Sequence, residues 1–124
     1  MFDVPPNDTA NLANRSANGH RRSAEGTNTV VWLWGEQDAA TSGQLRRTLT
    51  EQGSVMSTGS MIVNFRDVTF VDASMIGVLL AGRRAHNGRF MVAELPHCAR
   101  RLFALCNFLD VFVDHDPISV GRAS

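Results

Sequence analysis

The sequence contains no lysine and no tyrosine, and it has only two cysteines. All twelve basic residues are therefore arginine, which is typical of a gene with GC-rich codons and carries no information about mechanism. Two cysteines cannot form a disulfide framework. Cys98 and Cys106 fall in one predicted helix, separated by a rise of roughly 12 Å, so we expect two buried free thiols.

Long apolar runs are also lacking. No run approaches the roughly 20 residues that cross a bilayer, and the N-terminus has neither the basic flank nor the apolar stretch of a signal peptide. Twelve arginines balance twelve acidic residues to a formal net charge of zero, whereas a general nucleic-acid binder carries a basic excess. We therefore expect a cytoplasmic protein with no membrane span and no direct contact with nucleic acid.

Signatures of catalysis and of cofactor binding are absent. There is no Gly-x-Ser-x-Gly elbow, no Walker loop and no Gly-x-Gly-x-x-Gly fingerprint. The histidines are scattered without metal-ligand spacing. His97 adjoins Cys98, but neighbouring residues at a helix start point in different directions, so an exposed His97 without a role is expected. The sequence predicts a protein that is not an enzyme and holds neither a cofactor nor a metal.

The first 27 residues differ in composition from the rest. They are rich in asparagine, include Pro5 and Pro6, and contain few large apolar side chains. Such a segment buries too little surface to offset its ordering entropy. We therefore expect a flexible N-terminal arm over residues 1–27, with a short edge strand at Phe2–Val4, followed by one folded domain over residues 28–124.

Strand and helix patterns alternate from residue 29 onward. Strand patterns fall at 29–34, 61–65 (followed by the apolar 68–71), 90–93 and 108–113, and helix patterns at 38–52, 74–86 and 96–107, with a short terminal helix from Asp116. Asn87 and Gly88 provide a left-handed stop for the second helix. This order is typical of an α/β domain with a central mixed sheet of four to five strands and helical crossovers.

The segment from Val71 to Gly77 links a strand to a helix and contains one hydroxyl, that of Ser74. A serine at a helix start most often caps the helix by accepting a backbone N–H. A phosphate on the same oxygen would instead bring about two negative charges to the positive end of the helix, next to Asp72. The segment is therefore a candidate switch as well as a candidate cap.

Residues 30–114 resemble a STAS domain of the anti-sigma factor antagonist type. Gly35-Glu36-Gln37-Asp38 is similar to the Gly-Glu-hydrophobic-Asp turn of that family, and Asp72-Ala73-Ser74-Met75-Ile76-Gly77 to its Asp-Ser-Ser/Thr-Gly-Leu-Gly motif. The order and spacing of these motifs agree, as does Phe108–Phe112 with the family's Gly-Leu-Asp-x-Leu-Phe end.

The resemblance implies a regulatory binding protein. In the family, the unphosphorylated antagonist binds an anti-sigma factor, often a serine-protein kinase, and so releases a sigma factor; phosphorylation of the second hydroxyl residue of the motif breaks the complex. Ser74 corresponds to that phosphorylated residue. The partner-binding surface expected by the same correspondence consists of Asp38, Asp72, Ala73, Ser74, Met75 and Ile76.

Three positions depart from the family pattern: Ala73 replaces the first hydroxyl, Met75 replaces glycine, and Gln37 replaces an apolar residue. An alternative therefore stays open, in which the same fold acts as a scaffold or accessory subunit of a transporter or stress-signalling complex without phosphorylation.

Trp32 and Trp34 lie two residues apart on one predicted strand, so their side chains share a face. Two large aromatic side chains on one face are typical of a core anchor. If that face is open, they form an apolar patch for a partner or for a second subunit in a homodimer.

Overall fold

The computed structural model describes residues 17–51, 55 and 58–108, and this part of the chain forms one α/β domain. Four strands make a single sheet in the order β1-β2-β3-β4. They are β1 (Gly19–Glu25), β2 (Asn28–Gln37), β3 (Met61–Val71) and β4 (Phe90–Ala93). The strand β1 is antiparallel to β2, whereas β2, β3 and β4 are parallel. The expected mixed sheet with helical crossovers is confirmed.

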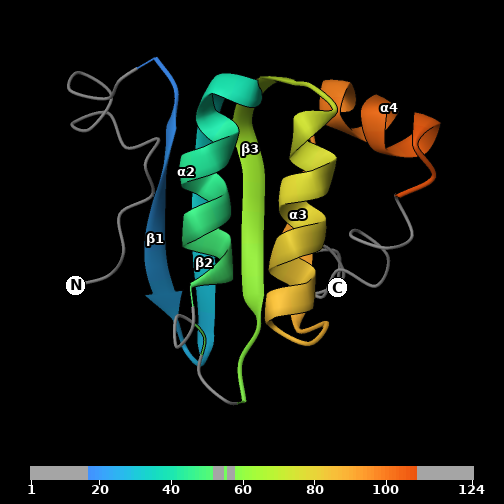
Figure 1. Ribbon diagram of the computed structural model, residues 1–124. Coiled ribbons are helices and arrows are strands. Elements are labelled where there is room, and N and C mark those ends of the chain that lie inside the picture. Colours follow the sequence, from blue (N-terminus) through green and yellow to red (C-terminus); the bar gives the residue numbers. More distant parts are fainter. Residues whose placement is uncertain (1–16, 52–54, 56–57, 109–124) are drawn as a thin grey trace, which may run out of the picture.

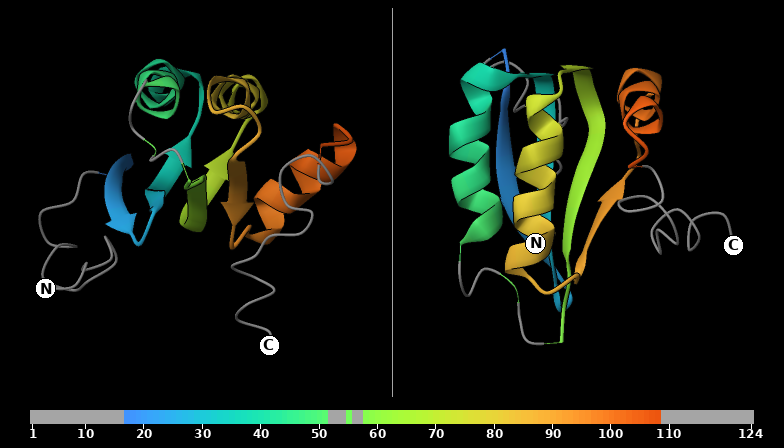
Figure 2. Two further views of the ribbon diagram at one scale, coloured as in Figure 1. Left: turned by 90° about the horizontal axis from the view of Figure 1, so that it is seen from below. Right: turned by 45° about the vertical axis from the view of Figure 1, so that its right-hand side comes forward.

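Two helices connect the parallel strands. The helix α2 (Ala39–Thr50) joins β2 to β3, and α3 (Ser74–Ala85) joins β3 to β4. They lie side by side on one face of the sheet (Figures 1 and 2). The third helix, α4 (His97–Leu105), follows β4 and lies at that edge of the sheet (Figure 2). None of these helices is long and apolar enough to cross a membrane.

The core fills the space between the sheet and the α2–α3 pair. Leu45 and Leu49 of α2 and Leu79 of α3 are fully buried against Val63 and Phe65 of β3. The ring of Phe103 on α4 meets Phe65 edge-on, with ring centroids 6.0 Å apart. The strand β3 contributes more residues to this cluster than any other strand.

The strand β3 is longer than expected because the two apolar stretches at 61–65 and 68–71 form one strand. Its register with β2 shifts twice, between Trp32 and Trp34 and between Gly35 and Glu36. Each shift places an extra residue in β3, and such bulges turn the following side chains. All five residues from Met61 to Phe65 are buried. Those of them that join the main core cluster fall at every second position up to Phe65, and the next cluster members of β3 are Val68 and Val71.

The expected flexible arm is wrong for its last part, because Gly19–Glu25 forms the strand β1. An edge strand needs little apolar surface, and its polar side chains bond to neighbours instead. The side chain of His20 bonds to Thr48 at 2.8 Å, and Arg22 donates to Glu51 at 2.7 Å. Composition alone underestimated these contacts. Residues 1–16, including the expected edge strand at Phe2–Val4, lie outside the described residues.

The expectations for the end of α3, for the two cysteines and for the C-terminal elements have different outcomes. Asn87 and Gly88 both have positive φ, 55° and 84°, which confirms the left-handed stop after α3. Cys98 is exposed and Cys106 half-buried, so the prediction of two buried thiols is wrong, although both cysteines are free. The last expected strand lies outside the described residues except for Phe108, as does the terminal helix from Asp116.

Trp32 and Trp34 are half-buried rather than core anchors. Trp32 lies on the face away from α2 and α3, where it packs against a small cluster that includes Val30 and Ile62. Its indole N–H donates to Ser23 at 2.9 Å, and the guanidinium of Arg66 lies 5.5 Å from its ring centroid. These contacts satisfy the indole N–H and place a cation over the ring face.

Two glycines of α3 differ in their surroundings, and we expect opposite effects of adding a methyl group. A Cβ at Gly77 meets no atom within 4 Å, whereas a Cβ at Gly82 would lie 2.6 Å from Cε2 of the buried Phe90. Gly77→Ala should raise the free energy of unfolding by about 0.5–1 kcal/mol, because alanine favours the helix. Gly82→Ala should be less stable than Gly77→Ala by about 1–3 kcal/mol, because it overpacks the core. Urea unfolding of the two variants measures this difference, and equal stabilities would contradict the packing described here.

Candidate functional site

The carboxyl ends of β2 and β3 lie beside each other, so the amino ends of α2 and α3 meet at one edge of the sheet (Figure 1). The pairing continues beyond the strand ends, because the backbone N–H of Asp72 donates to the carbonyl of Gln37 at 3.3 Å. Asp38 and Asp72 thus each follow a neighbouring parallel strand. In parallel α/β sheets, this edge is where binding sites are usually located.

Asp38 is the N-cap of α2. Its Oδ1 accepts the backbone N–H of Ala40 at 3.0 Å. Its own N–H donates to Oγ1 of Thr41 at 3.1 Å, which completes a capping box. The two residues fix the start of α2 together. Asp38 remains half-buried, so part of this turn faces solvent.

Ser74 is not the cap of α3, and that expectation is wrong. The N-cap position is Ala73, which has no side chain able to bond to the backbone. The capping role belongs to the residue before it, since Oδ1 of Asp72 accepts the backbone N–H of Ser74 at 2.9 Å. The hydroxyl of Ser74 also donates to Oδ1 of Asp72. Replacing the family's first hydroxyl by Ala73 therefore leaves the capping to a carboxylate.

The carboxylate of Asp72 lies between two helix ends. It accepts the hydroxyl and the backbone N–H of Ser74 on α3. The bond from the Ser74 hydroxyl contributes most to holding the pKa of Asp72 below its ordinary value of 3.8, and burial acts against it. The backbone N–H groups of Ser74 and, least of all, of Ala39 at the start of α2 lower the pKa further. Hydrogen bonds to the charged form favour that form. Asp72 is thus an ionised group bonded to the start of α3, with the first residue of α2 close enough to favour its charge.

Met75 and Ile76 are not on the surface. Their side chains are 0 % and 7 % exposed and pack in the core, so the prediction that they contact a partner is wrong. Met75 does not have a positive φ, so its replacement of a glycine leaves the helix start undistorted. Ala73 and Gly77 are exposed instead, on either side of the half-buried Ser74. Two small residues therefore flank Ser74 on the surface.

Phe70 was not singled out from the sequence, yet it is one of the two exposed large apolar side chains among the described residues. It is 48 % exposed and lies near the carboxyl end of β3, opposite the exposed Glu36 of β2. The sequence pattern places Phe70 next to the core-facing Val71. Whether another element covers Phe70 depends on the tertiary structure, and among the described residues none does. We define the carboxyl-end surface as the set of exposed or half-buried residues at this edge, namely Glu36, Asp38, Phe70, Asp72, Ala73, Ser74 and Gly77.

Gln37, which departs from the family's apolar preference, is fully buried. Its side-chain amide donates to the carbonyls of Trp34 and Gly19, at 2.8 and 3.1 Å. Because buried polar groups are stable only when hydrogen-bonded, these bonds account for the polar residue. They also attach the start of β1 to the turn that carries Asp38.

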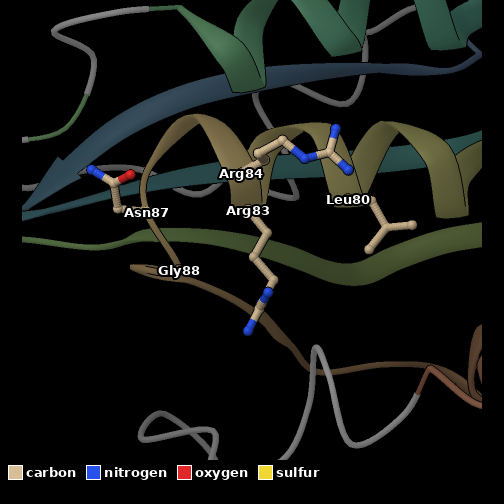
Figure 3. A pocket seen from close by; sticks show the side chains of 5 residues that line it. All are labelled: Leu80, Arg83, Arg84, Asn87 and Gly88. Atoms are coloured by element: carbon tan, nitrogen blue, oxygen red, sulfur yellow. The ribbon is translucent and has the colours of Figure 1, made fainter.

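A separate pocket lies at the other end of α3. It is lined by Leu80, Arg83, Arg84, Asn87 and Gly88, and the two arginine side chains extend from the last turn of the helix (Figure 3). The described residues contain no group of three or more side chains that could hold a metal ion. The only site at which sequence motifs and geometry coincide within this part of the chain is therefore the carboxyl-end surface.

The class of protein follows from the fold: this chain has the STAS fold, a small α/β domain with a mixed sheet and its helix starts gathered at one edge. No family model matches the chain. The structure of the anti-sigma factor antagonist SpoIIAA in its unphosphorylated form is similar, with a TM-score of 0.65 and 21 % sequence identity over 85 % of this chain and 96 % of that chain.

Two further solved structures share the fold. The Bacillus cell fate determinant SpoIIAA in its phosphorylated form matches with a TM-score of 0.58 and 20 % identity, covering 86 % of this chain and 100 % of that chain. A sulfate transporter family protein from Wolinella succinogenes matches with a TM-score of 0.61 and 12 % identity, covering 97 % of this chain and 95 % of that chain. The fold expected from the sequence motifs is confirmed, and it occurs both in antagonists and in a transporter family.

We expect Asp72→Asn to lower the free energy of unfolding by an amount that depends on pH. The pKa of Asp72 is lower in the folded protein than its ordinary 3.8, so its stabilising effect is present above that value and is lost as pH falls through the folded pKa. Near neutral pH, loss of the charged cap should cost about 1 kcal/mol. As the solution is acidified, the difference between variant and wild type should shrink. Thermal unfolding across the acidic range measures it, with Glu36→Gln as a control, and a constant difference would contradict the assignment.

Proposed function

We propose that this chain is an anti-sigma factor antagonist: it binds an anti-sigma factor that is itself a serine kinase, and phosphorylation of Ser74 ends the binding. The observation that carries the proposal is the Ser74 hydroxyl at the start of α3, flanked by exposed small residues and bonded to Asp72. The likeness to SpoIIAA, solved in both an unphosphorylated and a phosphorylated form, supports it. The protein acts as a regulator and not as an enzyme.

The proposed switch follows from the bonds of Asp72. A phosphorylated Ser74 has no hydroxyl hydrogen, so it can no longer donate to Asp72. It carries about two negative charges instead, which repel the carboxylate. Asp72 then has to move or lose its bonds to Ala39 and to the backbone of Ser74. Phosphorylation thereby changes the charge of the surface and the starts of both α2 and α3 at once.

The proposed partner surface is the carboxyl-end surface. It offers the half-buried carboxylates of Asp38 and Asp72, the exposed Glu36 and the apolar ring of Phe70. Gly77 and Ala73 allow a partner's backbone to come close to the Ser74 hydroxyl, because neither presents a long side chain. A partner with arginines or lysines around an apolar pocket is complementary to this surface.

A second candidate function is favoured by the match to the sulfate transporter family protein. In this alternative the domain is an accessory or scaffold unit, without control by phosphorylation. Incorporation of phosphate at Ser74 by the cognate kinase separates the two candidates: binding that persists without any incorporation favours the scaffold.

Substitutions of Ser74 test the switch. Ser74→Asp should weaken the complex with the cognate anti-sigma factor by at least about tenfold, because a second carboxylate is placed beside Asp72. Ser74→Ala should bind within about threefold of the wild type, since it adds no charge, but it should take up no phosphate from the kinase. Titration calorimetry gives the affinities, and phosphate incorporation is followed by mass spectrometry. Equal loss of affinity in both variants would argue against a switch at this residue.

Substitutions of Gly77 test whether the partner binds at the carboxyl-end surface. A Cβ at Gly77 meets no atom within 4 Å, so Gly77→Arg should fold, and its long charged side chain should lie beside Ser74. We expect its affinity for the anti-sigma factor to fall by at least about tenfold. Gly77→Ala is the matched control, with the same backbone change and no protruding group. Unchanged affinity for Gly77→Arg would move the partner surface away from the start of α3.

A further inference from the structure

The outer edge of β1 is not used by the proposed function. β1 is the first strand of the sheet, and among residues 17–51, 55 and 58–108 no strand pairs with its far side. Its pairing with β2 is regular over all seven residues, from Gly19 opposite Trp34 to Glu25 opposite Asn28, without a bulge. A regular edge strand presents a row of backbone donors and acceptors to another strand.

The hairpin between β1 and β2 determines which backbone groups point outward. Two residues, Gly26 and Thr27, connect the strands, so Glu25 and Asn28 form a hydrogen-bonded pair. Hydrogen-bonded pairs alternate along an antiparallel ladder. The N–H and C=O groups of His20, Arg22 and Ala24 therefore point away from β2, toward the free edge.

We propose that β1 pairs antiparallel with β1 of a second copy of this chain, around a two-fold axis at Ser23. In this register Arg22 lies opposite the partner's Ala24, and both have outward backbone groups that bond to each other. Arg21 lies opposite the partner's Glu25. The two sheets then form one continuous sheet, with α2 of both copies on the same face.

The charges of β1 select this register over its neighbours. Two residues that lie opposite each other in an antiparallel pair have side chains on the same face of the sheet. The two-fold axis must therefore pass through a residue position, and not between two residues. An axis at Arg22 would place that arginine opposite itself, and an axis at Ala24 would leave Arg21 and Arg22 opposite uncharged residues. The axis at Ser23 places opposite charges together twice, Arg21 with Glu25 from each copy, and opposite charges across strands stabilise pairing.

The side chains of β1 leave the edge accessible. On the α2 face, His20 is held by Thr48 and Arg22 by Glu51, so both are directed toward α2. On the other face, Ser23 accepts the indole N–H of Trp32, which fixes it at the proposed axis. Arg21 and Glu25 are exposed, as their pairing across the axis requires.

Sedimentation velocity of the full chain tests the proposal. A contact between two short strands is smaller than a standard interface, so we expect dimers that form between about 10 μM and about 1 mM. Arg21→Glu, and separately Glu25→Arg, should each raise the dissociation constant about tenfold, because like charges then face each other twice. The double variant Arg21→Glu/Glu25→Arg should return to within about threefold of the wild type.

Arg84→Glu is the matched control, since it makes the same charge change on the exposed surface of α3 and should leave the dissociation constant unchanged. Circular dichroism checks that each variant is folded, and Glu25→Arg carries the test if Arg21→Glu does not fold. A monomer at every concentration would overturn the proposal. So would a dimer insensitive to Arg21→Glu, or a double variant that associates no better than the single ones. None of these measurements depends on the anti-sigma factor or on Ser74.

Discussion

The carboxylate of Asp72 is bonded to the start of α3, and the position of the Ser74 hydroxyl depends on this contact. It accepts the backbone N–H and the hydroxyl of Ser74, and the backbone N–H of Ala39 on α2 adds a weaker interaction that favours the same charge. Parallel β-α-β units bring helix starts to one edge of a sheet, and a negative charge near these partially positive ends is stabilising. Asp72 supplies that charge from within the chain. The same carboxylate therefore stabilises the fold and orients the hydroxyl that is proposed to be modified.

This double role gives a physical reason for a switch at this position. A phosphate on Ser74 would compete with Asp72 for the same positive helix end, and only one of the two anions can be bonded there in the present geometry. Ala39 on α2 also favours the charged form of Asp72, so a phosphate on Ser74 would bear on the start of α2 as well. Met75 and Ile76, the next two residues of α3, are buried in the core and attach the helix start to the sheet. The STAS fold shared with SpoIIAA places these elements, and the residues at the edge give them their chemistry.

The sequence predicted the elements of the core well and those at the margins of the domain less well. The helix starting at Asp38, the strand at 90–93 and the stop at Asn87 and Gly88 follow from local patterns that the structure confirms. The strand Gly19–Glu25 was missed, because its stability comes from a neighbouring strand and from contacts to α2 that composition does not show. Cys98 was placed inside the protein although it is exposed, because residue type does not show which side of α4 faces the core.

At the candidate site, the motifs singled out Asp38, Asp72 and Ser74, since residue type and spacing are properties of the chain. Which of these groups cap a helix, and which side chains nearby are exposed, was decided by tertiary structure. Ser74 bonds to Asp72 instead of capping α3, because the carboxylate is near enough to take that role. Met75 and Ile76 turn inward and Phe70 outward, because the side of a helix or strand that is covered depends on the elements packed against it. Local sequence fixes what each side chain is able to do, and only packing between distant segments fixes what it touches.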